Sequence, residues 1–268
     1  MKGDFHLAYF PKNKISFDDV TWMIDHHPFQ VKGEILLHTD PTYFDFTLKT
    51  EGGNYKKAAG LLTDALRVKI DSFDIVQPFN AAVAIASVVE YKAKPHVVVS
   101  FDVDDADITT TMGMLSHASF NGSFINQVDS LELPGDLNSK FIFENISAEW
   151  SGMPMTSSLL EIENLLNPFL KCHIQSVFDL KALNDVMESS TISLIKGKGV
   201  LDVNYDGAIG TIDTVYPSIT GSLSLTDADF KYLPRDLFFQ QCFGSIQLID
   251  EDVVINNFTA TAGNTKLK

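Results

Sequence analysis

Apolar and polar residues alternate along most of the chain, the pattern of β-strands that bury one face. The segments with this pattern predict strands at residues 3–10, 15–24, 31–39, 43–50, 68–76, 81–91, 95–103, 107–112, 157–163, 170–178, 199–205, 209–215, 218–226 and 244–248. Residues 81–89 are nearly all apolar, which predicts a strand covered on both faces. Because the connections are short and turn-like, they favour antiparallel meanders over crossover units.

Two short segments have helical rather than strand periodicity. Residues 54–67 follow Asn54, a plausible N-cap, and residues 179–188 follow Asp179, which can cap the second segment. The pattern as a whole therefore predicts a mainly β fold. We expect a long curved antiparallel sheet that forms a repeating β-groove, as an open barrel or a taco-like sheet, with two short helices.

One short motif recurs along the chain. An apolar pair around one residue is followed by two Asp, Asn or Glu residues, an apolar residue and Thr or Ser, at residues 14–21, 140–147 and 253–259. The first two copies are offset by 126 positions without a gap, and a repeat of this kind dictates architecture. In the first copy, Asp18 and Asp19 interrupt the alternation, which predicts a β-bulge or bend.

The repeat divides the chain into three predicted parts. Residues 1–130 form a first groove repeat with the helix near 54–67, and residues 131–240 form a second repeat with the helix near 179–188. Residues 241–268 begin a third, truncated repeat. Since the chain stops within an apparent strand at residues 261–268, we expect it to be a segment of a longer protein.

The best candidates for a binding surface are apolar residues that share a strand face. On residues 43–50 and 95–103 these candidates are Phe44, Phe46, Leu48, Val97, Val99 and Phe101. They are either ordinary core or the lining of a groove for acyl chains. Each buried CH₂ contributes about 0.8 kcal/mol, so a sixteen-carbon chain in water costs on the order of 12 kcal/mol, which only a long apolar surface offsets. A register error of one residue would invert the facing of a strand.

Composition excludes some partners. The 268 residues carry a net charge of −15, which argues against nucleic acid and against adsorption on anionic lipid, since both require basic clusters. No apolar window of membrane-spanning length and no signal peptide are present in the sequence. Cys172 and Cys242 could form a disulfide, but two buried free thiols are the favoured interpretation.

Polar clusters give little support for catalysis or metal binding. Residues 202–213 resemble a calcium-binding loop, but Pro217 opposes an outgoing helix, so a hairpin with a Tyr-Asp-Gly turn is favoured. The carboxylates at residues 102–107 are typical of a strand end with a solvated face. His26, His27 and His38 lack the other features of a zinc site, and Ser116-His117 lacks a nucleophile elbow. We therefore expect no catalytic residue, metal or cofactor, and a protein that is not an enzyme.

The order of several segments resembles the AsmA-like family. The segments that carry the resemblance are residues 3–7, 17–20, 178–185, 197–203, 219–230 and 244–260. Membership would imply an envelope protein of a Gram-negative bacterium with a periplasmic β-groove, related to TamB-like and other bridge-like lipid transfer proteins. An N-terminal helix, which this chain lacks, would anchor the full-length protein in the inner membrane.

The resemblance implies a role in outer-membrane biogenesis and lipid transport, without catalytic residues. The leading hypothesis is therefore a non-enzymatic periplasmic segment whose apolar β-groove binds or conducts phospholipid acyl chains. The alternative is a structural or assembly module that binds an envelope protein partner through a sheet edge. A calcium-dependent module at residues 202–213 is a third, weaker hypothesis.

Overall fold

The protein is described from a computed structural model. The structure describes residues 6–10, 14–24, 27–56, 67, 71, 73–110, 113–187, 189–209 and 217–267. It is mainly β, with 72% of residues in strands. The first strands are β1 (His6–Phe10), β2 (Lys14–Ile24), β3 (His27–Leu36), β4 (Tyr43–Gly53), β5 (Asp74–Ile75), β6 (Phe79–Val88), β7 (His96–Thr110) and β8 (Gly113–Ile125). They are followed by η1 (Asp136–Asn138), β9 (Lys140–Trp150), β10 (Met153–Glu163), β11 (Phe169–Asp179), η2 (Leu180–Ala182), α3 (Leu183–Met187), β12 (Ile192–Ala208), β13 (Ser218–Tyr232), η3 (Leu233–Arg235), β14 (Leu237–Ile249), β15 (Asp252–Ala262) and β16 (Thr265–Leu267).

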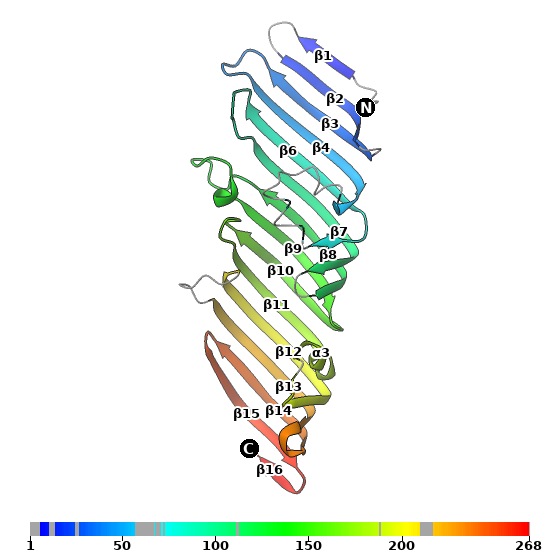
Figure 1. The fold of residues 1–268 in the computed structure, drawn as a ribbon, viewed down its shortest axis with the longest axis vertical. Coiled ribbons are helices and arrows are strands. Elements are labelled where there is room, and N and C mark those ends of the chain that lie inside the picture. Colours follow the sequence, from blue (N-terminus) through cyan, green and yellow to red (C-terminus); the bar gives the residue numbers. More distant parts are fainter. Residues whose placement is uncertain are drawn as a thin grey trace. The chain divides into compact units, whose positions relative to one another are not determined.

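The described strands form one antiparallel sheet of 16 strands that is not closed. Its order follows the chain from β1 to β16, except that β5 pairs with β7 outside this path (Figure 1). Sequential antiparallel strands need only hairpin connections, so this meander is what the short turns in the sequence predict. The predicted fold class is confirmed.

Two units divide the chain, and each is described by itself. Unit 1 comprises Met1–Thr111, Ser119–Phe143 and Glu161–Pro168. Unit 2 comprises Met112–Ala118, Glu144–Leu160 and Phe169–Lys268. The three predicted repeats remain a prediction.

Several strands bend at a residue in the left-handed backbone conformation. In four strands this residue directly precedes a side chain that is at most 1% exposed; the pairs are Asp105–Ala106, His117–Ala118, Asp227–Ala228 and Gln241–Cys242. The β13–β14 register shifts around Ala228, and the β14–β15 register shifts just after Gln241. An extra residue in one strand of a pair bends that strand, so the small buried residue marks the inside of a bend.

The recurring sequence motif coincides with such irregularities. Pairing of β2 with β3 shifts between Phe17 and Val20, so the bulge predicted at Asp18-Asp19 is confirmed. In the other two copies, Asn145 and Asn257 have positive φ values of 54° and 50°. Asn and Asp tolerate this conformation better than other residues with a side chain, which explains why the motif carries them.

The predicted helix at 179–188 is present as η2 followed by α3. Asp179 occupies the cap position, but its side chain makes no capping hydrogen bond, so its predicted role is wrong. Its carboxylate instead lies 3.9 Å from the Lys198 ammonium on the neighbouring strand. Most of the predicted helix at 54–67 falls on residues 57–66, outside the described residues.

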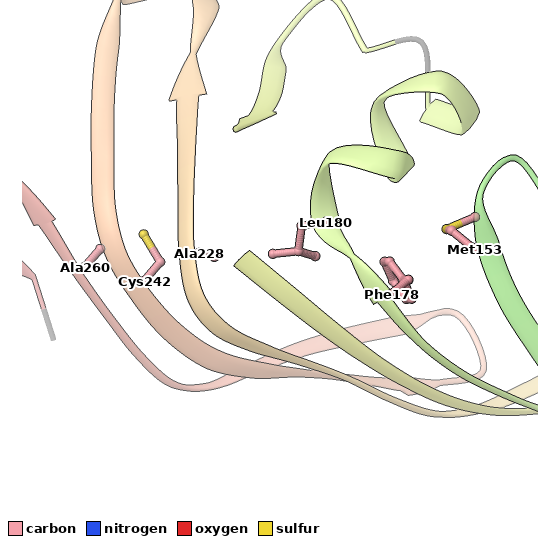
Figure 2. Close-up of a cluster of buried hydrophobic side chains, with 6 residues drawn as sticks. All are labelled: Met153, Phe178, Leu180, Ala228, Cys242 and Ala260. Carbon is pink, nitrogen blue, oxygen red and sulfur yellow. The ribbon is translucent and has the colours of Figure 1, made fainter. Parts of the chain in front are cut away.

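The η2–α3 segment packs on the inner side of bent strands of unit 2. A buried cluster there contains Met153, Phe178, Leu180, Ala228, Cys242 and Ala260. Figure 2 shows these side chains on the inner side of the bent strands, with η2–α3 in the same concavity. Leu180 is completely buried, and Ala182, Leu183 and Val186 of the same segment pack against the cluster as partly buried residues.

Three local predictions need correction. Tyr205-Asp206-Gly207 is not a turn, because β12 continues through it and pairs with β11. The carboxylates at 102–107 lie within one continuous strand, β7, instead of at a strand end, although most of them are solvated as expected. Residues 81–89 are not covered on both faces, since Ala84 in the middle of β6 is exposed. The two cysteines are free and buried, as favoured.

Candidate functional site

Strand pairing in unit 1 places all six predicted groove residues on one face of the sheet. Directly paired residues of antiparallel strands point to the same side. One row of paired residues is Val20, Val31, Leu48, Val83 and Val99, and the next is Phe17, Gly33, Phe46, Ile85 and Val97. Phe44 lies in the row beyond Phe46, and Phe101 lies in the row beyond Val99. We call this surface the apolar face of unit 1.

The six side chains are half-buried on β4 and β7. Side chains on this face are fully buried at the β2–β3 end, where Val20 and Val31 are each 1% exposed, and at Phe79 of β6 and Val103 of β7, which are 8% and 4% exposed. A sheet packed against a second layer would bury such residues along the whole row. The apolar face therefore leaves apolar surface accessible where β4, β6 and β7 pass through it.

The opposite face of the same strands consists mostly of polar or small residues. Its residues on β4, β6 and β7 are Asp45, Thr47, Lys49, Ala82, Ala84, Ala86, Val98, Ser100 and Asp102. A hollow of about 330 Å³ on this side is lined by polar groups that include Gln30, Lys49, Glu51, Asn80 and Asp102. Unit 1 thus separates an apolar face from a polar face, and only the apolar face suits a hydrocarbon ligand.

A group of phenylalanine rings continues the apolar face onto β8 and β9. The Phe101 ring lies 6.2 Å from that of Phe79, 6.1 Å from that of Phe120 and 6.2 Å from that of Phe143, all edge to face. Phe124 and Phe141 extend the group, with ring centroids 4.9 Å apart. Sequence reasoning missed these β8 and β9 rings, although their even spacing, four residues on β8 and two on β9, is the signal that could have revealed them.

Two glycines allow rings to lie across a neighbouring strand. A Cβ at Gly33 would overlap the Phe46 ring and the backbone of β4, and a Cβ at Gly122 would overlap the Phe101 ring. Glycine inside a strand usually marks such a close approach. The positions of the Phe46 and Phe101 rings, both predicted site residues, therefore depend on the absence of a side chain at Gly33 and Gly122.

Unit 2 has a similar division of faces. One row across β11 to β15 contains Ser176, Leu201, Leu223, Ile246 and Ile255. On the opposite side, the Gln175 amide donates to Asp202 over 2.8 Å, and His173 Nε2 lies 2.8 Å from the same carboxylate. Hydrogen bonds from Gln175 and His173 lower the pKa of Asp202 below its usual value. This network belongs to a solvated strand face.

Neither a cluster of metal ligands nor a helix suited to span a membrane occurs in the described part of the chain. No group of three or more His, Cys, Asp or Glu side chains is arranged to hold a metal there. Asp202, Asn204 and Asp206 alternate along a strand, and Asp213 lies outside the described residues, as does His26. No helix among those described has the length and apolar character needed to cross a membrane.

None of the family models, curated proteins or solved structures compared with the chain matches it. Function is therefore inferred from the chemistry of the surfaces themselves. The accessible apolar face of unit 1 is the strongest candidate, because it combines aligned strands, aromatic rings and a separate polar face.

Proposed function

We propose that the apolar face of unit 1 binds the acyl chains of a lipid, as a binding surface without catalysis. One observation carries this proposal. The residues Phe44, Phe46, Leu48, Val97, Val99 and Phe101 lie on one face in neighbouring rows and are only half-buried. A surface of this kind offers hydrocarbon contacts to a ligand while the polar face stays in water.

The dimensions suit an acyl chain. The Leu48 row crosses β2, β3, β4, β6 and β7, and four strand spacings of about 4.8 Å give a length of about 19 Å. The hydrocarbon core of a bilayer is about 30 Å thick and holds two leaflets, so one chain needs about 15 Å. At about 0.8 kcal/mol for each buried CH₂, ten groups in contact would contribute about 8 kcal/mol before the cost of ordering the chain.

The resemblance to the AsmA-like family extends the proposal. It suggests that the ligand is a phospholipid, that the surface lies in the periplasm, and that the full-length protein contributes to outer-membrane biogenesis from an inner-membrane anchor. The alternation of apolar and polar faces in both units is compatible with such a role.

Adjacent valines on β7 provide a matched test. Val99 lies on the apolar face and Val98 on the opposite face, and both are half-buried. Lipid that co-purifies with the protein is measured by native mass spectrometry and by solvent extraction. We expect Val99→Glu to lose bound lipid and Val98→Glu to retain it, with circular dichroism confirming that both variants fold. An unliganded wild-type protein, or equal lipid content in the two variants, would refute the proposal.

A second candidate function is assembly with an envelope protein through a sheet edge. The sheet is not closed, and β15 presents Val253 and Ile255, each 63% exposed, near the end of the strand order. Unpaired strand edges are templates for strand addition. Crosslinking through a photoreactive residue at position 254 that captures a protein, together with absence of lipid from the purified protein, would favour this function.

A further inference from the structure

Three neighbouring loops of unit 1 expose large apolar side chains at the same ends of their strands. They are residues 89–95, 126–139 and 164–168, which we call the loop edge. The Asn126 side chain accepts from Val97 N over 2.7 Å and donates to Pro95 O over 2.9 Å, which joins the first two loops. Asn164 N donates to Ser139 O over 2.9 Å, which joins the third. Figure 1 shows the first two loops on the same side of the sheet.

Most of the large apolar side chains of the loop edge are more than half exposed, and two of them are almost fully exposed. Leu131 is 93% exposed, Tyr91 is 92% exposed and Leu133 is 78% exposed. Leu137 and Leu166 are also more than half exposed, and both border a hollow of about 510 Å³ that Lys94 lines from the first loop. Isolated exposed leucines are ordinary, but Leu133, Leu137 and Leu166 border one hollow, and apolar side chains gathered in this way indicate an interaction surface.

The loop that carries the leucines has a defined internal structure. Asn138 is buried, and its amide oxygen accepts from Val128 N over 3.0 Å and from Asp129 N over 2.8 Å. Its amide nitrogen donates to Asp129 O over 2.8 Å. The Asp129 carboxylate accepts from Leu131 N over 2.8 Å. These bonds order the backbone before any ligand arrives, so Leu131 and Leu133 are presented at little further cost in entropy.

The charges at the loop edge argue against an anionic membrane as the partner. Its acidic residues are Glu90, Asp129, Glu132 and Asp136, and its basic residues are Lys92 and Lys94, which gives a net charge of −2. Anionic membranes attract clusters of four or more basic residues, which this edge lacks. The Lys92 ammonium lies 5.3 Å from the Tyr91 ring, and tyrosine is enriched where proteins meet the headgroup region of a bilayer.

We propose that the loop edge docks on the surface of a zwitterionic lipid bilayer by inserting the Leu131, Leu133 and Tyr91 side chains. The charged residues alternate with the apolar tips, so they can remain among headgroups and water while the tips enter the hydrocarbon boundary. The centre of a protein interface instead excludes such charges. The inference goes beyond the proposed function, because it concerns the surface of a membrane and not a lipid molecule held on the apolar face.

Vesicle binding tests this inference directly. The full chain is floated on a density gradient with phosphatidylcholine vesicles, and with vesicles that also contain phosphatidylglycerol. We expect binding to phosphatidylcholine, weaker binding when anionic lipid is added, and a loss of at least about tenfold in partitioning for each leucine replaced in the variants Leu131→Ser and Leu133→Ser. The control is Leu237→Ser, an exposed leucine of unit 2, which should bind like the wild type.

A fluorescence measurement reports the insertion itself. In Leu131→Trp, brominated phosphatidylcholine should quench emission beyond the background from Trp22 and Trp150, whereas Leu237→Trp should show no added quenching. Absence of vesicle binding by the wild type, or binding that rises with anionic lipid, would overturn the inference. Self-association that the leucine variants abolish, without vesicle binding, would overturn it in favour of a protein contact. The leucine variants should keep their co-purified lipid, whereas Val99→Glu should lose it. Failure of the docking inference can therefore be told apart from failure of the proposed function.

Discussion

Gly122→Ala should displace the ring at the centre of the aromatic group. The new methyl group would occupy the position of the Phe101 ring, which lies across Gly122 and contacts the rings of Phe79, Phe120 and Phe143. The ring can rotate away, so the cost is the loss of these contacts, each worth about 0.5–1.5 kcal/mol beyond area burial. Alanine also restricts the unfolded chain, which returns about 0.4–1 kcal/mol. For three contacts, the net loss of unfolding free energy should be about 0.5–4 kcal/mol.

Chemical denaturation measures this loss, with Gly135→Ala as the control. Gly135 has an extended backbone with φ of 162°, and a Cβ there would come no closer than 3.8 Å to a neighbouring side chain, so its replacement should be neutral or stabilising. In a Phe101→Leu background the ring is absent, and Gly122→Ala should then cost at least about 1 kcal/mol less. Equal costs in the two backgrounds would show that Gly122 is needed for some reason other than the ring.

Three further predictions concern backbone strain, pH and thiol reactivity. Gln241 has a φ of 48°, so Gln241→Gly should preserve or raise stability while Gln241→Val lowers it by about 1–2 kcal/mol, as measured by urea denaturation. Burial disfavours the charged Lys140, but hydrogen bonds to Glu161 and Glu163 outweigh it and raise its pKa. The resulting stability is present below the unfolded-state pKa of about 10.4 and is lost as pH rises through the folded-state pKa, so the urea midpoints of wild type and Lys140→Met should converge at alkaline pH. Burial, aided by Asp229, raises the pKa of Cys242 to about 11, so a disulfide reagent at pH 8 should label this thiol only after unfolding, and rapid labelling of the native protein would contradict its burial.

Strand faces could be predicted because their signal is local. Phe44, Phe46 and Leu48 share a face through the twofold period of any strand, whatever its neighbours are. The bulge at Asp18-Asp19 could also be predicted, since two polar residues interrupt an apolar alternation. The alignment of Ile85 with Phe46 and Val97 could not be predicted from the sequence, because register is set by pairing across strands.

Other predictions failed where short-range patterns were ambiguous. The apolar run on β6 indicated a strand covered on both sides, but its outward residues are Ala82, Ala84 and Ala86, whose small side chains tolerate exposure. Tyr205-Asp206-Gly207 has the composition of a turn, yet β12 continues because its residues pair with strands on both sides. The loop at 126–139 is ordered by Asn138, whose four side-chain hydrogen bonds go to Val128, Asp129 and Leu133, and no spacing rule predicts these partners.

The strand order has a consequence for how such a protein could change in length. Apart from β5, every described strand pairs only with its immediate neighbours along the chain. A duplicated hairpin could therefore be inserted without altering any existing partnership, and it would add about 10 Å of surface. Folding could likewise proceed hairpin by hairpin, since few contacts between distant segments must form first. If the apolar face binds lipid as proposed, the length of its binding surface would change in steps of two strands.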